Sequence, residues 1–347
     1  MAANSEKSDP TELQAKMLAV EAKMKANAVQ FRLDPALDEY AKQYIKKSLA
    51  ANTLRAYKED IQLFRHWCEK REVPYLPASP ATVANFLAAQ GVQQTPNLKM
   101  STIRRRAAAI RYLHKMADVE MPPTNSEVVK KTIAGIMREK LVAPHKKASA
   151  TDDLIHRMVD KIDTSTLIGK RDRALILFGF AGAFRRSELI SLKMEDLEAH
   201  PKGLRVMIRK SKTDQTGKGR IKPIIKGSQY CPVQALTDWI QAAGIKEGYV
   251  FRRLHKSGIA LSHNQPETPE LTSQVVAFVV KKYARMIGLD SNLFAGHSLR
   301  RGFITSGVRK GKKIEKLVEI THQTLQTLMN YYEDIHQFED HAGEGLL

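Results

Sequence analysis

The sequence predicts a mainly α-helical protein of two domains, with one small β-hairpin in the second domain. With 347 residues the chain is long enough for two domains, and its apolar content of 43% suffices for ordinary hydrophobic cores. Apolar residues recur at helical intervals through most of the chain and alternate with polar residues only around residues 203–227. Residues 141–151 contain Pro, Lys and small residues without an apolar period, which is typical of an interdomain linker.

The N-terminal domain is predicted over residues 34–140 as a set of helices. The stretch NTLRAYKEDIQLFRHWCEK places five apolar residues on one face, namely Leu54, Tyr57, Ile61, Phe64 and Cys68. The stretch SPATVANFLAAQ begins with a Ser cap followed by Pro in the first turn. Ahead of this domain, residues 1–33 carry a few apolar residues at helical spacing after the capping signal SDPTE, which predicts an N-terminal arm with a loosely docked helix.

A third helix of this domain, STIRRRAAAIRYLHKM, has one apolar and one basic face. Ile103, Ala107, Ile110 and Leu113 are predicted to point inward. The outward face is predicted to carry the cations Arg104, Arg105, Arg106, Arg111 and Lys115. Such a face can simply be solvated, but the charge of the whole chain favours a helix that contacts phosphates.

The charge balance predicts a polyanionic partner. Lys and Arg number 56 and Asp and Glu 37, which gives a net charge of +19 at pH 7, so double-stranded nucleic acid is the expected partner. The sequence has no apolar run long enough to cross a bilayer and no signal-peptide core, so we expect a cytoplasmic, nucleoid-associated protein without a membrane partner. Cys68 and Cys231 lie among apolar neighbours and are expected to be small core residues.

The second domain, residues 152–335, is predicted to be of mixed α+β type. The stretch RDRALILFGFAGAFRRSELISLKMEDL predicts a buried helix that breaks near Gly182, and GLRVMIRK and GRIKPIIKG predict a hairpin around the turn SKTDQTGK. Further helices are predicted at CPVQALTDWIQAAG, TSQVVAFVVKKYARMIG, HSLRRGFITSGVRKG and KKIEKLVEITHQTLQTLMNYYEDI. With no Gly-rich phosphate loop and no clustered metal-ligand motif, we expect no cofactor, ATP or metal.

His297 and Arg300 are three positions apart at the start of one of these helices, so their side chains share a face. An imidazole and a guanidinium can each donate hydrogen bonds to one anion, and the guanidinium can hold two phosphate oxygens. The pair alone is a weak signal. It becomes informative through the motifs that stand before and after it in the chain.

Those motifs form an ordered set that resembles the tyrosine recombinase, or phage integrase, family. The set comprises R-x-S-E-L at residues 185–189, a hairpin Lys, H-x-x-R at 297–300, and His322 followed nine residues later by Tyr331. The likeness extends over about residues 35–335. It implies a helical core-binding domain followed by an α+β catalytic domain, as in the two-domain members of the family.

The resemblance also implies a role for each motif residue. Tyr331 would attack a DNA phosphodiester, forming a 3′-phosphotyrosine and releasing a 5′-hydroxyl, so that resealing needs no ATP. Arg185 and Arg300 would clamp the non-bridging oxygens, for which a planar bidentate cation suits better than Lys. The remaining roles are hydrogen bonds from His297 and His322, protonation of the leaving oxygen by Lys212, and orientation of the cationic cluster by Glu188.

Three assignments have alternatives in the sequence. Arg186 competes with Arg185, although the R-x-S-E-L register favours Arg185. Lys210, Lys218 and Lys222 lie near Lys212. Tyr332 could be the nucleophile with Tyr331 in the core, but the interval from His322 favours Tyr331, and Tyr332 fits the apolar series of Leu325, Leu328 and Met329 better. Two residues depart from the family pattern, Thr321 where Gly often precedes the His, and Arg301 where many members have another His.

The function implied by the resemblance is site-specific DNA recombination by a homotetramer on two DNA sites, through a Holliday junction, as used by mobile elements. The alternatives are a type IB topoisomerase that works as a monomer and a non-catalytic basic DNA-binding protein. The resemblance also implies that the C-terminal tail, residues 336–347, docks on a neighbouring protomer, and its few apolar residues, too few to fold alone, agree with this. The alternative is a frayed terminus. The sequence does not specify the target DNA, the direction of recombination or any accessory factor.

Overall fold

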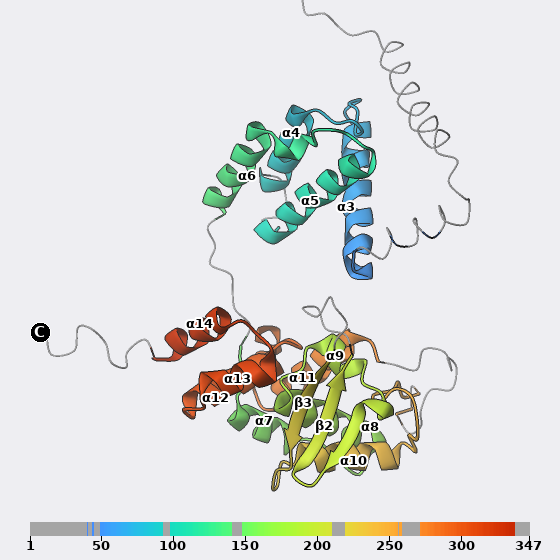
Figure 1. Ribbon diagram of the computed structural model, residues 1–347, viewed down its shortest axis with the longest axis vertical. Helices are drawn as coiled ribbons and strands as arrows, with labels where there is room; N and C mark the ends of the chain where they lie inside the picture. The colour runs from blue at the N-terminus through green and yellow to red at the C-terminus, as the bar shows by residue number, and fades with distance from the viewer. Residues whose placement is uncertain are drawn as a thin grey trace, which may run out of the picture. The chain divides into compact units, whose positions relative to one another are not determined.

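The structure, a computed structural model, describes residues 49–92, 98–140, 148–209, 219–255, 257–258 and 271–336, together with residues 40 and 44. The chain divides into two compact units, Met1–Pro144 and His145–Leu347 (Figure 1). The predicted arm, the linker up to residue 147, the hairpin turn with Lys212, and the tail after residue 336 lie outside the described residues.

The first unit is helical, as the sequence predicts. Its elements are α3 (Ala51–Glu69), α4 (Pro80–Val92), α5 (Met100–Met116), the 3-10 turn η1 (Pro123–Asn125) and α6 (Glu127–Glu139). Phe64 and Cys68 of α3 are fully buried against Phe86 of α4. The predicted Ser cap is confirmed, since the Ser79 hydroxyl accepts a hydrogen bond of 3.0 Å from the backbone of Thr82.

A buried carboxylate links α3 to α5 and corrects one prediction about the basic helix. Asp60 is 4% exposed, and Arg105 donates to it from Nε and one terminal nitrogen at 2.7 and 3.1 Å. Arg106, predicted to face outward, is turned inward and half-buried: its Nε lies 3.6 Å from Asp60, and it donates to Gln90. The buried charge of Asp60 requires cationic partners, which explains the inward turn. Arg104, Arg111 and Lys115 are exposed.

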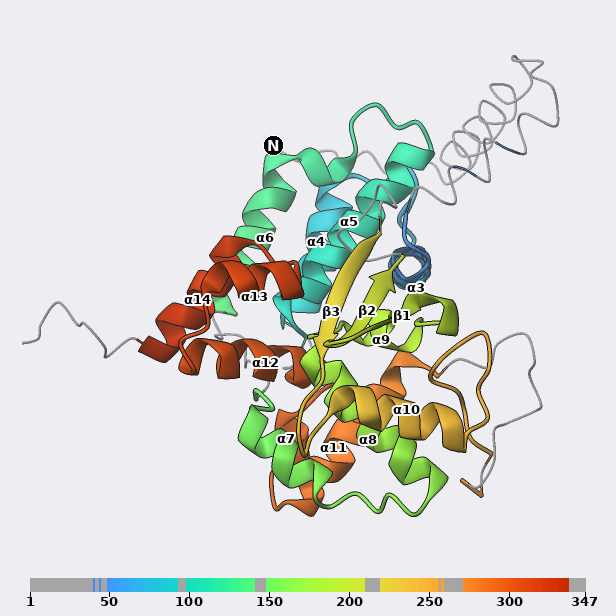
Figure 2. The ribbon, with the colours of Figure 1, turned by 60° about the horizontal axis from the view of Figure 1, so that its bottom comes forward.

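The second unit packs helices, among them α8 and α10, against one side of a small antiparallel sheet (Figure 2). Its helices are α7 (Asp152–Val159), α8 (Leu167–Ala181), α9 (Arg186–Ile190), α10 (Pro232–Ala242), α11 (Ser273–Met286), α12 (Ser298–Arg309), α13 (Ile314–Thr321) and α14 (Leu325–His336), with 3-10 turns η2 (Met194–Asp196) and η3 (Ser291–Leu293). The strands are β1 (Leu197–His200), β2 (Gly203–Ile208) and β3 (Arg220–Ile225), in the order β1-β2-β3.

The predicted hairpin is confirmed, because β2 and β3 pair antiparallel from Gly203 opposite Ile225 to Ile208 opposite Arg220. Strand β1 was not predicted from the sequence. Its four residues are mostly exposed, so they lack the alternation of apolar and polar residues that marks a half-buried strand. The register places Lys222 opposite Val206, which is fully buried.

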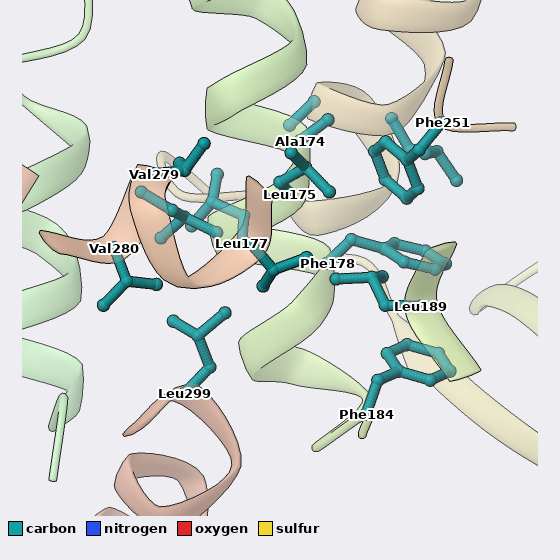
Figure 3. Packing of buried hydrophobic residues seen from close by; sticks show 14 of the residues in the cluster. Ala174, Leu175, Leu177, Phe178, Phe184, Leu189, Phe251, Val279, Val280 and Leu299 are labelled. Carbon is teal, nitrogen blue, oxygen red and sulfur yellow. The ribbon is translucent and has the colours of Figure 1, made fainter. Parts of the chain in front are cut away.

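Helix α8 is the centre of the second core (Figure 3). Leu175 and Phe178 of α8 are fully buried, and Leu189 of α9 and Leu299 of α12 pack against the same helix. Gly179 permits this approach, because a Cβ at that position would lie 3.0 Å from a methyl carbon of each leucine. The residues that flank Leu189 and Leu299 in the chain, Glu188 and Arg300, are thereby fixed relative to each other.

Residues 148–151, at the end of the predicted linker, pack on the second unit. The backbone N–H of Ala148 donates to Leu293 at 2.8 Å, and that of Ala150 donates to Ser298 at 3.1 Å. Gly302 makes the contact with α12 possible, since a Cβ there would lie 1.7 Å from the carbonyl oxygen of Ala150.

The last predicted helix is divided in two, which corrects the expectation of one continuous helix. Helix α13 ends at Thr321, and His322 follows in the left-handed conformation, with φ of 50°. The hydroxyl of Thr324 then accepts from the backbone of Thr327 at 3.3 Å and starts α14. The break frees the carbonyl of Thr321, which accepts from Arg300.

Candidate active site

Arg300 lies on α12 and is 4% exposed. Its guanidinium donates to the carbonyl of Ala183 at 2.7 Å and also to the carbonyl of Thr321, so it connects the α8–α9 turn to the α13–α14 turn. Burial lowers the pKa of Arg300 to about 10, and the nearby charge of Arg185 adds to this effect. The side chain therefore remains protonated at neutral pH in a fixed position.

Arg185 and Glu188 form an ion pair at the start of α9. Arg185 donates from its side chain to Glu188 at 2.6 Å and from its backbone N–H at 3.0 Å. Glu188 is 3% exposed, and burial alone would raise its pKa. The hydrogen bond from the Arg185 backbone and the positive charge of Lys222 outweigh burial, so the pKa of Glu188 is lowered and its carboxylate is ionised.

Lys222 of β3 is a buried cation in the same cluster, with 1% of its surface exposed. Its Nζ donates to the carbonyl of Gly182 at 2.8 Å and lies 5.1 Å from the ring centroid of Phe184. Burial lowers the pKa of Lys222 to about 7, against the attraction of Glu188, and the charges of Arg300 and Arg185 lower it further.

His322 occupies the turn between α13 and α14. Burial, together with the positive charges of Lys222 and Arg220, lowers its pKa to about 4, so the imidazole is neutral at physiological pH. Its Nε2 is buried and has no hydrogen-bond partner among the described residues. A neutral imidazole that can donate from Nε2 is suited to hydrogen-bond an incoming anion.

Tyr331 of α14 is partly buried against Ile304, Val308, Leu317 and Leu328. Its negative charge, when ionised, would raise the pKa of Arg300, so the phenol lies within electrostatic reach of that guanidinium. Tyr332 is 42% exposed, with its ring 4.4 Å from that of His336. The interpretation that Tyr332 fits the apolar series better is therefore wrong, because the tyrosine on the packed face is Tyr331.

Arg301 covers Tyr331, with its guanidinium carbon 5.4 Å from the ring centroid. Its Nε donates to the hydroxyl of Ser149 at 3.1 Å, and that hydroxyl lies 3.0 Å from the hydroxyl of Thr305. The cation at this position is therefore held between the segment that precedes α7 and the phenol ring. A cation over an aromatic ring is attracted to it by the ring quadrupole.

Two predicted site residues remain, His297 and Lys212. His297 is the N-cap residue of α12 and is exposed, one turn before Arg300. Lys212 lies outside the described residues. Arg186, the alternative to Arg185, packs against Gly296, where a Cβ would lie 1.8 Å from its Cδ. The structure thus brings together Arg185, Glu188, Arg300, His322 and Tyr331 of the predicted set.

Sequence reasoning did not select Lys222, Arg220 or Arg301 for the site. Lys222 was only one of several lysines near Lys212, and Arg301 only a departure from a pattern. A signal for Lys222 is present in the alternation of β3. Ile224 lies on the buried face of the strand and Ile221 and Ile225 on the exposed face, so Lys222 falls on the buried face, where a cation needs a specific partner.

The arrangement can bind and activate a phosphate diester. Arg185, Lys222 and Arg300 outnumber the one buried carboxylate, Glu188, so the cluster attracts an anion. Guanidinium groups beside a phenol favour both the growing charge on phosphate and the phenolate form of the nucleophile. No three His, Cys, Asp or Glu side chains gather as a metal site in the described part of the chain.

Two family models match the chain. Residues 149–337 match the phage integrase family, and residues 37–120 match the N-terminal SAM-like domain of phage integrases. The integrase/recombinase xerD homolog of Selenomonas ruminantium is 36% identical over 307 residues, which cover 87% of each chain. None of the helices in the described segments is long and apolar enough to span a bilayer.

Solved structures share the fold. The Tn1549 transposon integrase in complex with transposon right end DNA aligns with a TM-score of 0.57 at 16% identity, covering 86% of this chain and 96% of that one. The XerH site-specific recombinase in its post-cleavage complex with a palindromic difH substrate aligns with a TM-score of 0.55 at 18% identity, covering 77% of this chain and 72% of that one.

Proposed function

Because this chain belongs to the phage integrase family and is a tyrosine site-specific recombinase, we propose that Tyr331 is the residue that becomes linked to DNA. The observation that carries this proposal is the position of the Tyr331 ring, which lies under Arg301 and within electrostatic reach of Arg300. Free tyrosine has a pKa near 10, so its attack on phosphate benefits from adjacent positive charge.

In the proposed reaction the Tyr331 oxygen attacks the phosphorus of a DNA phosphodiester. The bond from phosphorus to the 5′-oxygen breaks, leaving a 3′-phosphotyrosine and a free 5′-hydroxyl. Attack by the 5′-hydroxyl of a second strand reverses the step and releases the tyrosine. The phosphotyrosine keeps the energy of the phosphodiester, so the exchange needs no ATP.

We propose that Arg185, Arg300 and the two histidines donate hydrogen bonds to the non-bridging phosphate oxygens. The buried carbonyl and carboxylate partners of the arginines hold the guanidinium groups before substrate arrives, and such preorganised donors stabilise a pentacoordinate transition state most effectively. His322 offers its unpaired Nε2 to the same oxygens. His297, exposed at the start of α12, would reach the phosphate from the DNA side and assist proton removal from Tyr331.

The leaving 5′-oxygen needs a proton, which we assign to Lys212 in the hairpin turn. The turn follows Arg209, and Asp196 accepts a hydrogen bond from that guanidinium while Glu195 lies 3.0 Å from it. The base of the hairpin is thereby anchored beside β2. Lys212 follows Arg209 by three residues in the sequence, and a flexible lysine side chain is suited to deliver a proton as a general acid.

We propose that the first unit grips the DNA backbone through α5. Arg104, Arg111 and Lys115 are exposed on this helix, whereas Asp60 engages Arg105 and Arg106. Phosphate contacts of this kind give affinity without reading sequence. We expect the protein to work on nucleoid DNA, or on a mobile element carried there.

For assembly we propose a homotetramer on two DNA sites, with each tail docked on a neighbour. The tail contains Glu339, Asp340 and Glu344 as well as apolar Phe338, Leu346 and Leu347. A hollow beside α14 is lined by Val308, Arg309, Gly311, Lys312, Lys313, Ile314, Tyr332 and His336. Its basic and apolar lining complements an acidic segment with apolar residues, which supports docking at this place.

The proposal is tested with nicked suicide duplexes. A tight-binding duplex is first selected from a random-sequence library, and versions nicked at successive positions are then incubated with the protein in EDTA. A nick close to the cleavage point lets the 5′-hydroxyl fragment diffuse away, so a covalent adduct accumulates. We expect an SDS-resistant adduct with one nick position. Absence of an adduct at every position, or an adduct that requires magnesium, contradicts the mechanism.

A further inference from the structure

Lys222 stands on β3 at a position where a sheet core normally holds an apolar side chain. It is 1% exposed, lies between exposed Ile221 and exposed Pro223, and faces the same side as buried Ile224. Burying an ammonium group costs free energy unless partners repay it. The groups that stabilise the buried charge of Lys222 all belong to the candidate active site.

The first partner is the turn that connects α8 to α9. Lys222 donates to the carbonyl of Gly182, and Arg300 donates to the next carbonyl, that of Ala183. Ala183 has a φ of 44°, a conformation that L-residues seldom adopt. A Cβ at Gly182 would lie 2.1 Å from the ring of Phe184. Two cations therefore hold a tight turn that leads directly into Arg185.

The second partner is the charge of Glu188. The positive charge of Lys222 lowers the pKa of this carboxyl, and the carboxylate in turn favours the charged form of Lys222. Around Lys222 the charged and titratable groups are Glu188 and Arg185 of α9, Arg300 of α12, Arg220 of β3, and His322 between α13 and α14. The charge of Lys222 thus interacts with those of Arg185 and Arg300 and affects the pKa of His322, the residues expected to hold the phosphate together with His297.

The environment of Lys222 also argues against direct proton delivery to DNA. Its Nζ is enclosed, already donates to Gly182, and lies over the ring of Phe184. A general acid has to reach the leaving oxygen within hydrogen-bond distance. Lys222 is therefore placed to hold neighbouring protein groups and is not placed to reach the substrate.

We propose that Lys222 is a positioning residue for DNA cleavage, whose ammonium group fixes the α8–α9 turn and balances Glu188 so that Arg185, Arg300 and His322 are held ready for the scissile phosphate. The inference rests on the proposed function of this site. Because burial lowers the pKa of Lys222 to about 7, the charge is present at pH 6 and largely lost at pH 9. The effect of removing it must therefore depend on pH.

The test compares single-turnover cleavage by wild type and Lys222→Met on the nicked duplex that yields an adduct, at saturating protein and from pH 6 to pH 9. Met fills the same space without charge. We expect wild type to be faster by about tenfold or more at pH 6, the loss typical of a charged hydrogen-bond partner, and this ratio to shrink about threefold or more by pH 9. Lys226→Met, at an exposed position beyond the end of β3, serves as the control and should match wild type. A ratio that is constant with pH overturns the proposal, because a packing defect does not follow the Lys222 titration.

A substrate with sulfur in place of the 5′-bridging oxygen separates positioning from acid catalysis. Sulfur leaves without protonation, so it rescues a variant that lacks the general acid. We expect Lys222→Met to remain slow on this substrate while Lys212→Ala is rescued. Full rescue of Lys222→Met would make Lys222 the acid and overturn the positioning role.

A third measurement does not require cleavage. Lys222 helps to hold the pKa of His322 at about 4, so an NMR titration of labelled histidine should show that this pKa rises in Lys222→Met. An unchanged His322 pKa in a folded variant contradicts the coupling. Failure of the proposed function would instead appear as the absence of any wild-type adduct, whereas failure of this inference leaves the wild-type adduct intact.

Discussion

Gly302 gives a prediction whose sign and size both follow from the structure. In Gly302→Ala the new Cβ would lie 1.7 Å from the Ala150 oxygen and 2.3 Å from its carbon. Both atoms belong to the backbone and cannot rotate away. Gly135 of α6 is the matched control, because it is also inside a helix and a Cβ there meets nothing within 4 Å.

Replacing Gly by Ala inside a helix contributes about 1 kcal/mol of stability through backbone entropy and propensity, so Gly135→Ala should gain about that much. In Gly302→Ala the same gain is opposed by loss of the hydrogen bond from Ala150 to Ser298, about 1 kcal/mol. Overpacking costs about 1–3 kcal/mol more. The net result is destabilisation of the second unit by about 2 kcal/mol.

Cleavage should fall as well, because Ser149, next to Ala150, holds Arg301 over Tyr331. Urea titration with pulse-labelling hydrogen exchange and mass spectrometry measures the unfolding of each unit separately. We expect Gly302→Ala to shift only the second unit to lower urea and Gly135→Ala to shift only the first to higher urea. If Gly302→Ala were neutral or stabilising, the contact between residues 148–151 and α12 would be refuted.

The pKa of Lys222 is about 7 in the folded state and 10.5 ordinarily, so between these two pH values the folded protein binds fewer protons than the unfolded one. The free energy of unfolding of the second unit should therefore rise by about 2 kcal/mol from pH 7 to pH 9, measured by urea unfolding as the difference between wild type and Lys222→Met. The same pH dependence of stability in both proteins would contradict this. Arg301→Gln should slow adduct formation up to about tenfold with DNA binding unchanged, because it removes a cation worth about 1 kcal/mol from the Tyr331 ring. Arg253→Gln, at an exposed position of the second unit, should not slow it, and equal rates for Arg301→Gln and wild type would exclude this role for Arg301. Arg111→Gln and Lys115→Gln should each reduce the salt dependence of DNA binding by about one counterion, measured by filter binding as the slope of log affinity against log salt concentration. An unchanged slope would mean that α5 does not contact the DNA backbone.

The sequence predicted the elements that depend on local pattern. The helices and the hairpin of β2 and β3 follow from periodicity and turn residues that each stand within a short stretch. The order of the motifs was sufficient to indicate the family. Tyr331 was selected from its spacing to His322, which the structure explains, because His322 lies in the turn before α14 and Tyr331 lies within α14.

The remaining features depend on contacts between distant segments. Lys222 is buried because Glu188 and the Gly182 carbonyl receive it, although neither is near it in the chain. Arg106 turns inward because of Asp60, on another helix. The helix breaks at His322 where Arg300 takes the Thr321 carbonyl. In each case one buried polar group requires a partner that periodicity does not reveal.

The central claim is that Tyr331 forms the covalent bond to DNA. The direct measurement is mass spectrometry of the adduct from the nicked duplex, after digestion with nuclease and trypsin, with fragmentation that separates the two neighbouring tyrosines. We expect a nucleotide remnant on Tyr331, no adduct with Tyr331→Phe despite normal DNA binding, and a normal adduct with Tyr332→Phe. A remnant on Tyr332, or an adduct that persists in Tyr331→Phe, would contradict it.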